Sequence, residues 1–155
     1  MKRLIMRIIG TPIGASSLAG LLGVVMTIAI SGTARADGVC GPDTLRGLYV
    51  FNPHGFNIVN GVAQPTAVFE GIRFNGDGTL SVPFATVSIN GLILHFPPGG
   101  TGTYTLNQNC EGTLTFNAGP IHYDIFVRAN EEEIEMIRTD ANSVLNGTAK
   151  SKRGD

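Results

Sequence analysis

The fold is decided by the run Ala67-Val-Phe-Glu-Gly-Ile-Arg-Phe-Asn-Gly-Asp-Gly-Thr79 and the residues directly after it. Its β-rich first part ends in Asn75-Gly-Asp-Gly78, which predicts a hairpin turn because asparagine and glycine adopt positive φ at little cost. A second run, Thr79 to Ile89, ends in a similar turn, Asn90-Gly91, and leads into Leu92-Ile-Leu-His-Phe96. The sequence therefore predicts three consecutive antiparallel strands joined by tight turns.

Short β-rich runs and turn residues continue on both sides of these three strands. Pro83 indicates an edge or a bulge in its strand, because proline has no N–H to donate to a ladder. Val59 to Gln64 is expected to form an open loop near one barrel mouth. The other expected strands are 45–51, 102–106, 112–116, 121–127 and 143–149.

The segment Glu133 to Thr139 is compatible with two structures. Asn130 followed by three glutamates could cap a helix, since acidic residues stabilise a helix N-terminus. However, Ile134 and Met136 alternate with Glu133 and Glu135, which is typical of a half-buried strand. The regular hairpins before this segment favour the strand.

The expected fold is all-β: an antiparallel meander of about eight strands that forms a small closed β-barrel. Consecutive hairpins favour an up-and-down meander over a Greek key. A barrel of about this size has an interior just wide enough for side chains or one small ligand. An interior filled by phenylalanines would leave no room for a ligand; the candidates are Phe51, Phe69, Phe84 and Phe116.

The N-terminus has the three parts of a secretory signal peptide. Lys2, Arg3 and Arg7 precede an apolar run over 18–30, and Ala34-Arg-Ala36 is a small-x-small cleavage pattern. We therefore expect a signal peptide over 1–36 and a single barrel domain over 37–155, exported to the periplasm or the extracellular medium. The apolar run is shorter than the roughly 20 residues of a bilayer span, so no stable membrane span is expected after cleavage.

The charge limits the possible partners, and the cysteines are typical of an exported protein. Seven basic and twelve acidic residues follow residue 36, a net charge of about −5, and no basic cluster is present, which disfavours nucleic-acid binding. Cys40 and Cys110 are the two cysteines, and in an oxidising compartment such a pair predicts a disulfide. In the chain-entropy model a bridge closing this loop contributes about 4 kcal/mol.

Three segments resemble a known group of proteins. They are Gly102-Thr-Tyr-Thr-Leu-Asn-Gln-Asn-Cys-Glu-Gly-Thr-Leu-Thr-Phe116, Cys40-Gly-Pro-Asp-Thr-Leu-Arg-Gly-Leu-Tyr-Val-Phe51 and Ile121-His-Tyr-Asp124. Together they resemble small secreted bacterial proteins of unknown function, in which a Cys-x-Gly turn joins two Thr-rich strands. These motifs are structural, so the resemblance implies the fold and secretion.

More remotely, the strand pattern is similar to the allene oxide cyclase and dirigent class of calycin-like barrels. That class binds apolar or phenolic molecules inside an eight-stranded barrel and steers their cyclisation or coupling. No catalytic residue of that class matches a position in this sequence. Isomerase chemistry is therefore implied by analogy of fold alone.

Glu70 and Tyr49 are the candidate catalytic residues. Glu70 shares a strand face with apolar side chains, which places it at a barrel mouth or buried beside a partner, since an unpaired buried charge is costly. A buried glutamate has a raised pKa and can act as a general acid or base. The structural alternative is a rim carboxylate paired with Arg73, Arg128 or Arg138.

Tyr104, His122 and Asp124 are the candidate ligand-binding residues. His122 and Asp124 share one face of a strand whose other face is apolar, so they form an exterior row unless the barrel holds a polar pocket. Tyr104 could place its hydroxyl in a cavity. The three histidines have no metal-ligand spacing, and neither a metal site nor a cofactor is predicted.

Three functions remain open from the sequence. The first is a secreted or periplasmic barrel that binds a small apolar ligand or a partner without catalysis. The second is a cyclase or isomerase that holds an apolar substrate in the barrel. The third is a structural envelope protein. The sequence decides neither the ligand, nor catalysis, nor the oligomeric state, nor which strand faces point inward.

Overall fold

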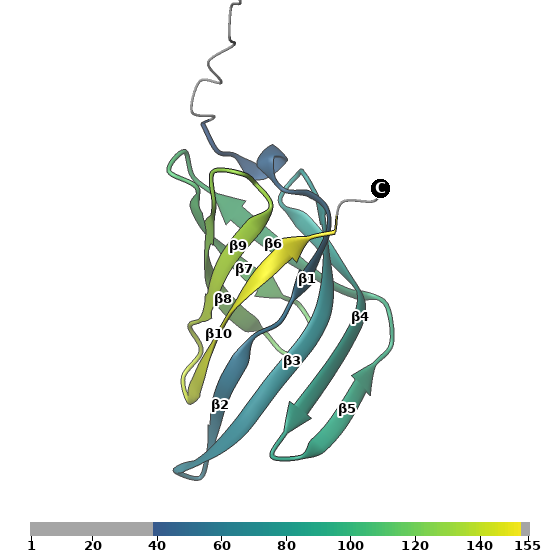
Figure 1. Cartoon of the computed structure of the whole chain (residues 1–155), viewed down its shortest axis with the longest axis vertical. Helices are drawn as coiled ribbons and strands as arrows, with labels where there is room; N and C mark the ends of the chain where they lie inside the picture. Colours follow the sequence, from purple (N-terminus) through teal and green to yellow (C-terminus); the bar gives the residue numbers. More distant parts are fainter. Residues whose placement is uncertain (1–38, 153–155) are drawn as a thin grey trace, which may run out of the picture. The chain divides into compact units, whose positions relative to one another are not determined.

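The computed structural model describes residues 39–152, which form ten strands and one short 3-10 helix (Figure 1). The expected signal peptide, residues 1–36, lies outside the described residues. The elements are η1 (Pro42–Thr44), β1 (Arg46–Phe51), β2 (His54–Val59), β3 (Val62–Asn75), β4 (Thr79–Ile89), β5 (Leu92–Phe96), β6 (Gly100–Leu106), β7 (Glu111–Phe116), β8 (Ile121–Val127), β9 (Glu133–Arg138) and β10 (Ser143–Ser151).

An antiparallel barrel closes where β10 pairs with β1. Around the barrel the order is β1, β3, β4, β6, β7, β8, β9, β10 and back to β1. β1 pairs with residues 70–75 of β3, and β2 pairs with residues 62–67 of the same strand. β1 and β2 therefore lie end to end between β3 and β10. The predicted all-β fold and closed barrel are confirmed, with β2 and β5 as two additional strands.

β4 changes its partner half-way along its length. Its first residues pair with β6 and its last ones, from Ala85, pair with β5. The register with β3 shifts between Gly71 and Arg73, opposite the stretch that contains Pro83, so the irregularity expected at this proline is present. As a result the β4–β5 hairpin extends past the barrel wall at the same end as the β2–β3 hairpin (Figure 1).

The expected open loop over Val59 to Gln64 is wrong. Val59 and Val62 are a cross-strand pair, and the turn between them consists only of Asn60 (φ 51°) and Gly61 (φ 77°). This is the asparagine–glycine hairpin signal that was used elsewhere in the chain. The residues before this turn form a strand, β2, which was not predicted from the sequence.

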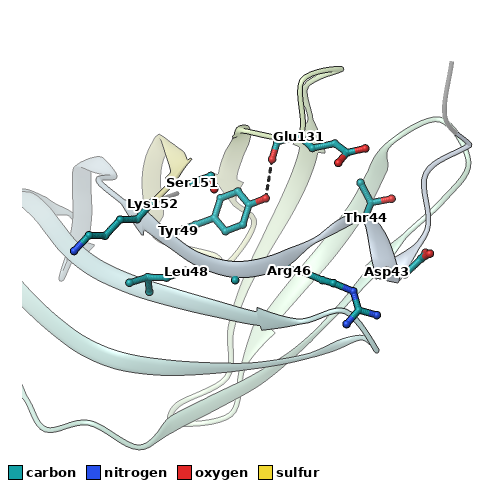
Figure 2. A pocket seen from close by; sticks show the side chains of 9 residues that line it. Asp43, Thr44, Arg46, Leu48, Tyr49, Glu131, Ser151 and Lys152 are labelled. Atoms are coloured by element: carbon teal, nitrogen blue, oxygen red, sulfur yellow. Dashed lines mark hydrogen bonds between the residues drawn. The ribbon is translucent and has the colours of Figure 1, made fainter. Parts of the chain in front are cut away.

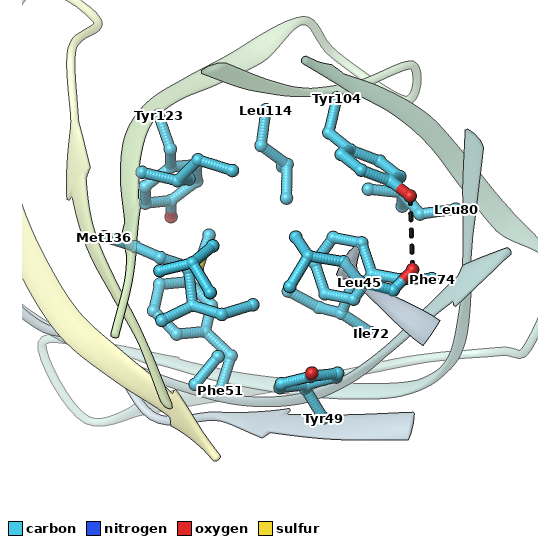
Figure 3. Packing of buried hydrophobic residues seen from close by; sticks show 14 of the residues in the cluster. Leu45, Tyr49, Phe51, Ile72, Phe74, Leu80, Tyr104, Leu114, Tyr123 and Met136 are labelled. Atoms are coloured by element: carbon cyan, nitrogen blue, oxygen red, sulfur yellow. Dashed lines mark hydrogen bonds between the residues drawn. The ribbon is translucent and has the colours of Figure 1, made fainter. Parts of the chain in front are cut away.

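Side chains from around the wall fill one end of the barrel, called here the closed end (Figure 3). The ring of Phe74 is central there, with edge-to-face contacts to Tyr49 at 5.3 Å and Tyr104 at 5.0 Å between centroids. Such geometry is the preferred one for aromatic pairs. Other side chains buried in this cluster are Leu45, Phe51, Ile72, Leu80, Leu114, Ile134 and Met136.

The closed end is also covered. The Tyr104 hydroxyl donates to the carbonyl oxygens of Pro42 at 2.6 Å and Leu45 at 3.3 Å, which fixes η1 over the barrel. The predicted Cys40–Cys110 disulfide is present and ties this N-terminal segment to the β6–β7 turn. The bridge is compatible with an oxidising, exported environment.

The four phenylalanines considered for the interior divide into two pairs. Phe51 and Phe116 are buried inside the barrel. Phe69 and Phe84 lie on the outer face, with ring centroids 5.5 Å apart, and Phe69 is 49 % exposed. Phe84 covers Gly71, where a Cβ would come within 2.6 Å of its ring. The interior is therefore not filled by all four rings.

No helix within residues 39–152 has the length and apolar character needed to cross a bilayer.

Candidate functional site

A cavity of about 600 Å³ lies at the other end of the barrel, called here the open end. One wall is made by inward side chains of three neighbouring strands. Val68 of β3, Val87 of β4 and Leu94 of β5 form one row across this wall, and Glu70, Ala85 and Phe96 form the next. The opposite wall comes from β7 to β10 and includes Phe116, Ile121, Tyr123 and Leu145.

The wall exists because of the partner change in β4. Beyond Ala85 this strand pairs with β5 instead of β6, so the cavity stays open on one side. Leu94 and Phe96 line the cavity, yet they are 37 % and 51 % exposed. Binding of a ligand or partner to such exposed apolar side chains is favourable, because it removes their surface from water.

Glu70 lies at the inner end of the cavity. Toward the closed end, the next inward residues of β3 are the buried Ile72 and Phe74; toward the open end they are Val68 and Thr66, which line the cavity. Glu70 is 8 % exposed. Among residues 39–152 no hydrogen bond or ion pair reaches its carboxylate, and burial raises the pKa of this group to about 7.

Tyr123 is the second polar group of the cavity. It is 3 % exposed, and its ring is held edge-to-face by Phe51 and Phe116, at 5.4 and 6.1 Å between centroids. Burial, and then the negative charge of Glu70, raise the pKa of its hydroxyl, which places the two groups within electrostatic reach of each other. Within the described part of the chain, every side-chain oxygen that is shielded from solvent has a hydrogen-bond partner. The Tyr123 hydroxyl forms no such bond there, so it is reached by solvent and faces the cavity.

Arg138 also lines the cavity, opposite Tyr123 on the neighbouring strand. Its Nε donates to Asp140 at 2.7 Å, and Asp140 also bonds His122 Nδ1 at 2.7 Å. Burial alone would raise the pKa of Asp140, but the hydrogen bonds from His122 and Arg138 outweigh it and hold this pKa at about 2. The positive charge of Arg138 is therefore balanced by the carboxylate of Asp140, whereas no ion pair balances the charge of Glu70.

Tyr49 does not join Glu70. Its hydroxyl donates to the carbonyl oxygen of Glu131 at 2.7 Å (Figure 2). It borders a separate and more polar depression of about 350 Å³, together with Asp43, Arg46 and Lys152. The structure thus does not bring the two candidate catalytic side chains into one cavity, and Tyr123 occupies the place expected for Tyr49.

The three candidate ligand-binding residues lie outside the cavity. Tyr104 is 4 % exposed, and its hydroxyl is engaged by backbone carbonyls at the closed end. His122 and Asp124 point outward from β8, while Tyr123 and Ile125 point inward. This is the exterior row that the apolar face of the strand favoured.

The rim pairing considered for Glu70 is not present either. Arg128 bonds Glu135 at 2.6 Å, Arg138 bonds Asp140, and Arg73 is exposed on the outer face of β3. Within residues 39–152 no three histidine, cysteine, aspartate or glutamate side chains come together as a metal site would require.

Comparison with protein-family models, with curated proteins and with solved structures gave no match for this chain. The function is therefore argued from the cavity itself. Its chemistry is that of an apolar chamber with one carboxyl group and one phenol at the inner end.

Proposed function

We propose that the protein is an exported β-barrel that binds a small, largely apolar ligand in the cavity at its open end. The observation that carries the proposal is the cavity of about 600 Å³, lined mostly by apolar side chains and ending at Glu70 and Tyr123. Ligand sites are typically concave, mostly apolar and of roughly 300–1,000 Å³, with a few polar groups that orient the ligand.

The remaining features of the chain support this proposal. The signal-peptide pattern over 1–36 and the Cys40–Cys110 disulfide support export to the periplasm or the medium. The exposed apolar side chains of the wall, Leu94 and Phe96, supply surface whose burial contributes about 25 cal/mol per Å².

Glu70 favours a second candidate, a cyclase or isomerase that acts on an apolar substrate in the same cavity. A carboxyl group with a pKa of about 7 can both accept and return a proton near neutral pH. Tyr123 could donate a hydrogen bond to a developing oxyanion. The remote similarity of the strand pattern to the allene oxide cyclase and dirigent class points in the same direction.

Native mass spectrometry tests the binding function directly. The protein would be purified from its exported compartment without detergent, and a co-purifying small molecule that is lost on unfolding is expected. Its mass would name the compound class in which to look for turnover. A protein that carries no such molecule and binds no apolar probe would contradict the proposal and favour a structural role.

Two variants of β4 provide a matched pair. Val87→Trp fills the cavity from its wall and is expected to abolish binding of an apolar fluorescent probe. Ser88→Trp adds the same side chain to the outer face of the same strand and is expected to leave binding unchanged. Equal loss in both variants would show that the cavity is not the binding site.

A further inference from the structure

Glu70 gives the cavity a chemical preference that its apolar lining does not have. Its carboxylate is 8 % exposed, lies at the inner end of a cavity, and has no cationic partner among residues 39–152. Placing a carboxylate in such a site without a counter-charge is costly, because burial removes its hydration. A ligand that supplies the counter-charge would remove this cost.

Among residues 39–152, the four cationic side chains described next are engaged away from Glu70. Arg138 is paired with Asp140, and Arg128 and Lys150 are paired with Glu133 on the outside of the barrel. Arg46 lies at the closed end, where its guanidinium donates to the Asn75 carbonyl. None of them supplies a charge for Glu70.

The other polar groups of the cavity do not change this balance. The Thr66 hydroxyl donates to the Gln64 carbonyl at 3.1 Å, and the Asn57 side-chain oxygen accepts from Ser143 at 3.2 Å. The groups left at the inner end are the carboxylate of Glu70, which only accepts hydrogen bonds, and the hydroxyl of Tyr123. When Glu70 is ionised, this end favours a ligand group that donates, and the Tyr123 hydroxyl can accept a hydrogen bond from the same group.

We propose, on the basis of the binding function above, that the ligand is an amphiphile with a primary ammonium group that pairs with Glu70. The ammonium enters first and lies between the carboxylate and the Tyr123 hydroxyl, with the apolar body along Val87, Leu94 and Phe96. An ammonium has three donors, which suits this pair of oxygens. A carboxylate at the same place would repel an ionised Glu70.

Three probes of equal chain length separate the possible ligand classes: decylamine, decanol and decanoic acid, each used below its micelle-forming concentration. In calorimetric titrations near pH 8 the wild-type protein is expected to bind decylamine at least about tenfold more tightly than decanol, a difference of about 1.4 kcal/mol. Glu70→Gln is expected to remove this preference and to leave decanol binding unchanged.

Asp124→Asn is the matched control. It removes one negative charge from the outer face of β8, next to Tyr123 in the chain, without touching the cavity. The amine preference is expected to persist in this variant. If Asp124→Asn reduced the preference as much as Glu70→Gln does, a general attraction of cations to an acidic protein would explain it, and the proposal would be overturned.

The pH dependence gives an independent readout. Tyr123 of β8 and Arg138 of β9 line the same cavity as Glu70, and burial raises the pKa of the Tyr123 hydroxyl further above neutrality. Asp140, behind Arg138, stays ionised because its pKa is about 2. Amine affinity is therefore expected to rise about tenfold between pH 6 and pH 8 as Glu70 ionises, and to stay constant in Glu70→Gln.

The outcomes separate the two proposals. Decanol binding without an amine preference would leave the binding function intact and overturn the ammonium assignment. A preference for decanoic acid would also overturn it and would point to Arg138. Failure of all three probes to bind would contradict the binding function itself.

Discussion

The two ends of the barrel differ in packing. At the closed end the rings of Tyr49, Phe74 and Tyr104 interlock, η1 covers them and a disulfide holds the cover in place. At the open end the wall leaves Leu92, Leu94 and Phe96 exposed. The difference indicates that the closed end stabilises the fold and that the open end is available for binding.

Charged side chains are unevenly distributed along the chain. Residues 47–69 and 79–110, which include all of β2 and β5, contain no aspartate, glutamate, lysine or arginine. The acidic cluster Glu131–Glu133 lies instead in the β8–β9 turn and the start of β9. Glu70 is the exception, because in the part of the chain that the structure describes it is the one acidic side chain that lines the cavity. A buried carboxyl group without an ion pair, in a cavity, is more typical of a functional group than of a solvated surface.

The largest expected effect on stability comes from a matched pair of truncations, one at each end. Phe74→Ala removes a ring that is 2 % exposed and is expected to lower the free energy of unfolding by about 3–5 kcal/mol. Phe96→Ala removes a ring that is 51 % exposed and is expected to cost less than about 1 kcal/mol while weakening ligand binding. Urea unfolding and probe titration of both variants test this. Equal losses of stability would contradict the division into two ends.

Loss of the disulfide is expected to follow in magnitude. Cys40→Ser combined with Cys110→Ser opens a loop of sequence separation 70 and is expected to lower the free energy of unfolding by about 4 kcal/mol in the chain-entropy model. Under conditions where the variant is folded, the cavity at the other end should still bind the probe. Denaturant unfolding and probe titration are the measurements, and loss of binding in a folded variant would show that the two ends are coupled.

Glu70 is expected to make the ligand-free protein less stable as the pH rises. Its pKa is raised from an ordinary 4.5 to about 7, so between these values the folded state retains a proton that the unfolded state has lost. Stability is therefore expected to fall through this window by about 3 kcal/mol in total. Glu70→Gln should be as stable as the wild type at pH 4 and more stable at pH 8. Unfolding curves at both pH values test this; a pH-independent difference would contradict the buried position of the carboxyl.

The smallest expected effect concerns Asp140. Asp140→Asn removes the carboxylate that holds Arg138 and is expected to lower the free energy of unfolding by about 1 kcal/mol near neutral pH. The guanidinium of Arg138 then lacks the carboxylate that balances its charge. Decanoic acid should then bind more tightly than to the wild type, and decylamine less tightly. Unchanged probe preferences would show that Arg138 has no influence on the cavity.

Much of the fold could be predicted from local signals. Asn75-Gly-Asp-Gly78 and Asn90-Gly91 located β3, β4 and β5, because a two- to four-residue turn fixes the strands on both sides of it. The alternation of Ile134 and Met136 with acidic residues correctly indicated a strand for β9, since both apolar side chains are buried. The one missed strand, β2, lies beside a turn of the same type at Asn60-Gly61.

The site was harder to predict. Whether a side chain lines the cavity depends on its position along the barrel axis as well as on the strand face it occupies. Alternation predicted that Glu70 shares a strand face with apolar side chains, but it did not decide whether this face points inward. It could not distinguish Tyr123, which faces the cavity, from Tyr49 and Tyr104, which face the packed end. The partners of those two hydroxyls, Glu131 and Pro42, lie 82 and 62 residues away in the sequence. Hydrogen bonds between residues so far apart in the sequence form only once the barrel has closed, and local patterns do not predict them.

The central claim is that binding belongs to the open end, and a decanol titration followed by NMR on isotope-labelled protein tests it most directly. The account predicts chemical-shift changes at residues of the cavity wall, among them Val87, Leu94 and Phe116, and none at Phe74 or Tyr104 of the closed end. Changes concentrated around Phe74 and Tyr104, or no saturable change at any residue, would contradict it.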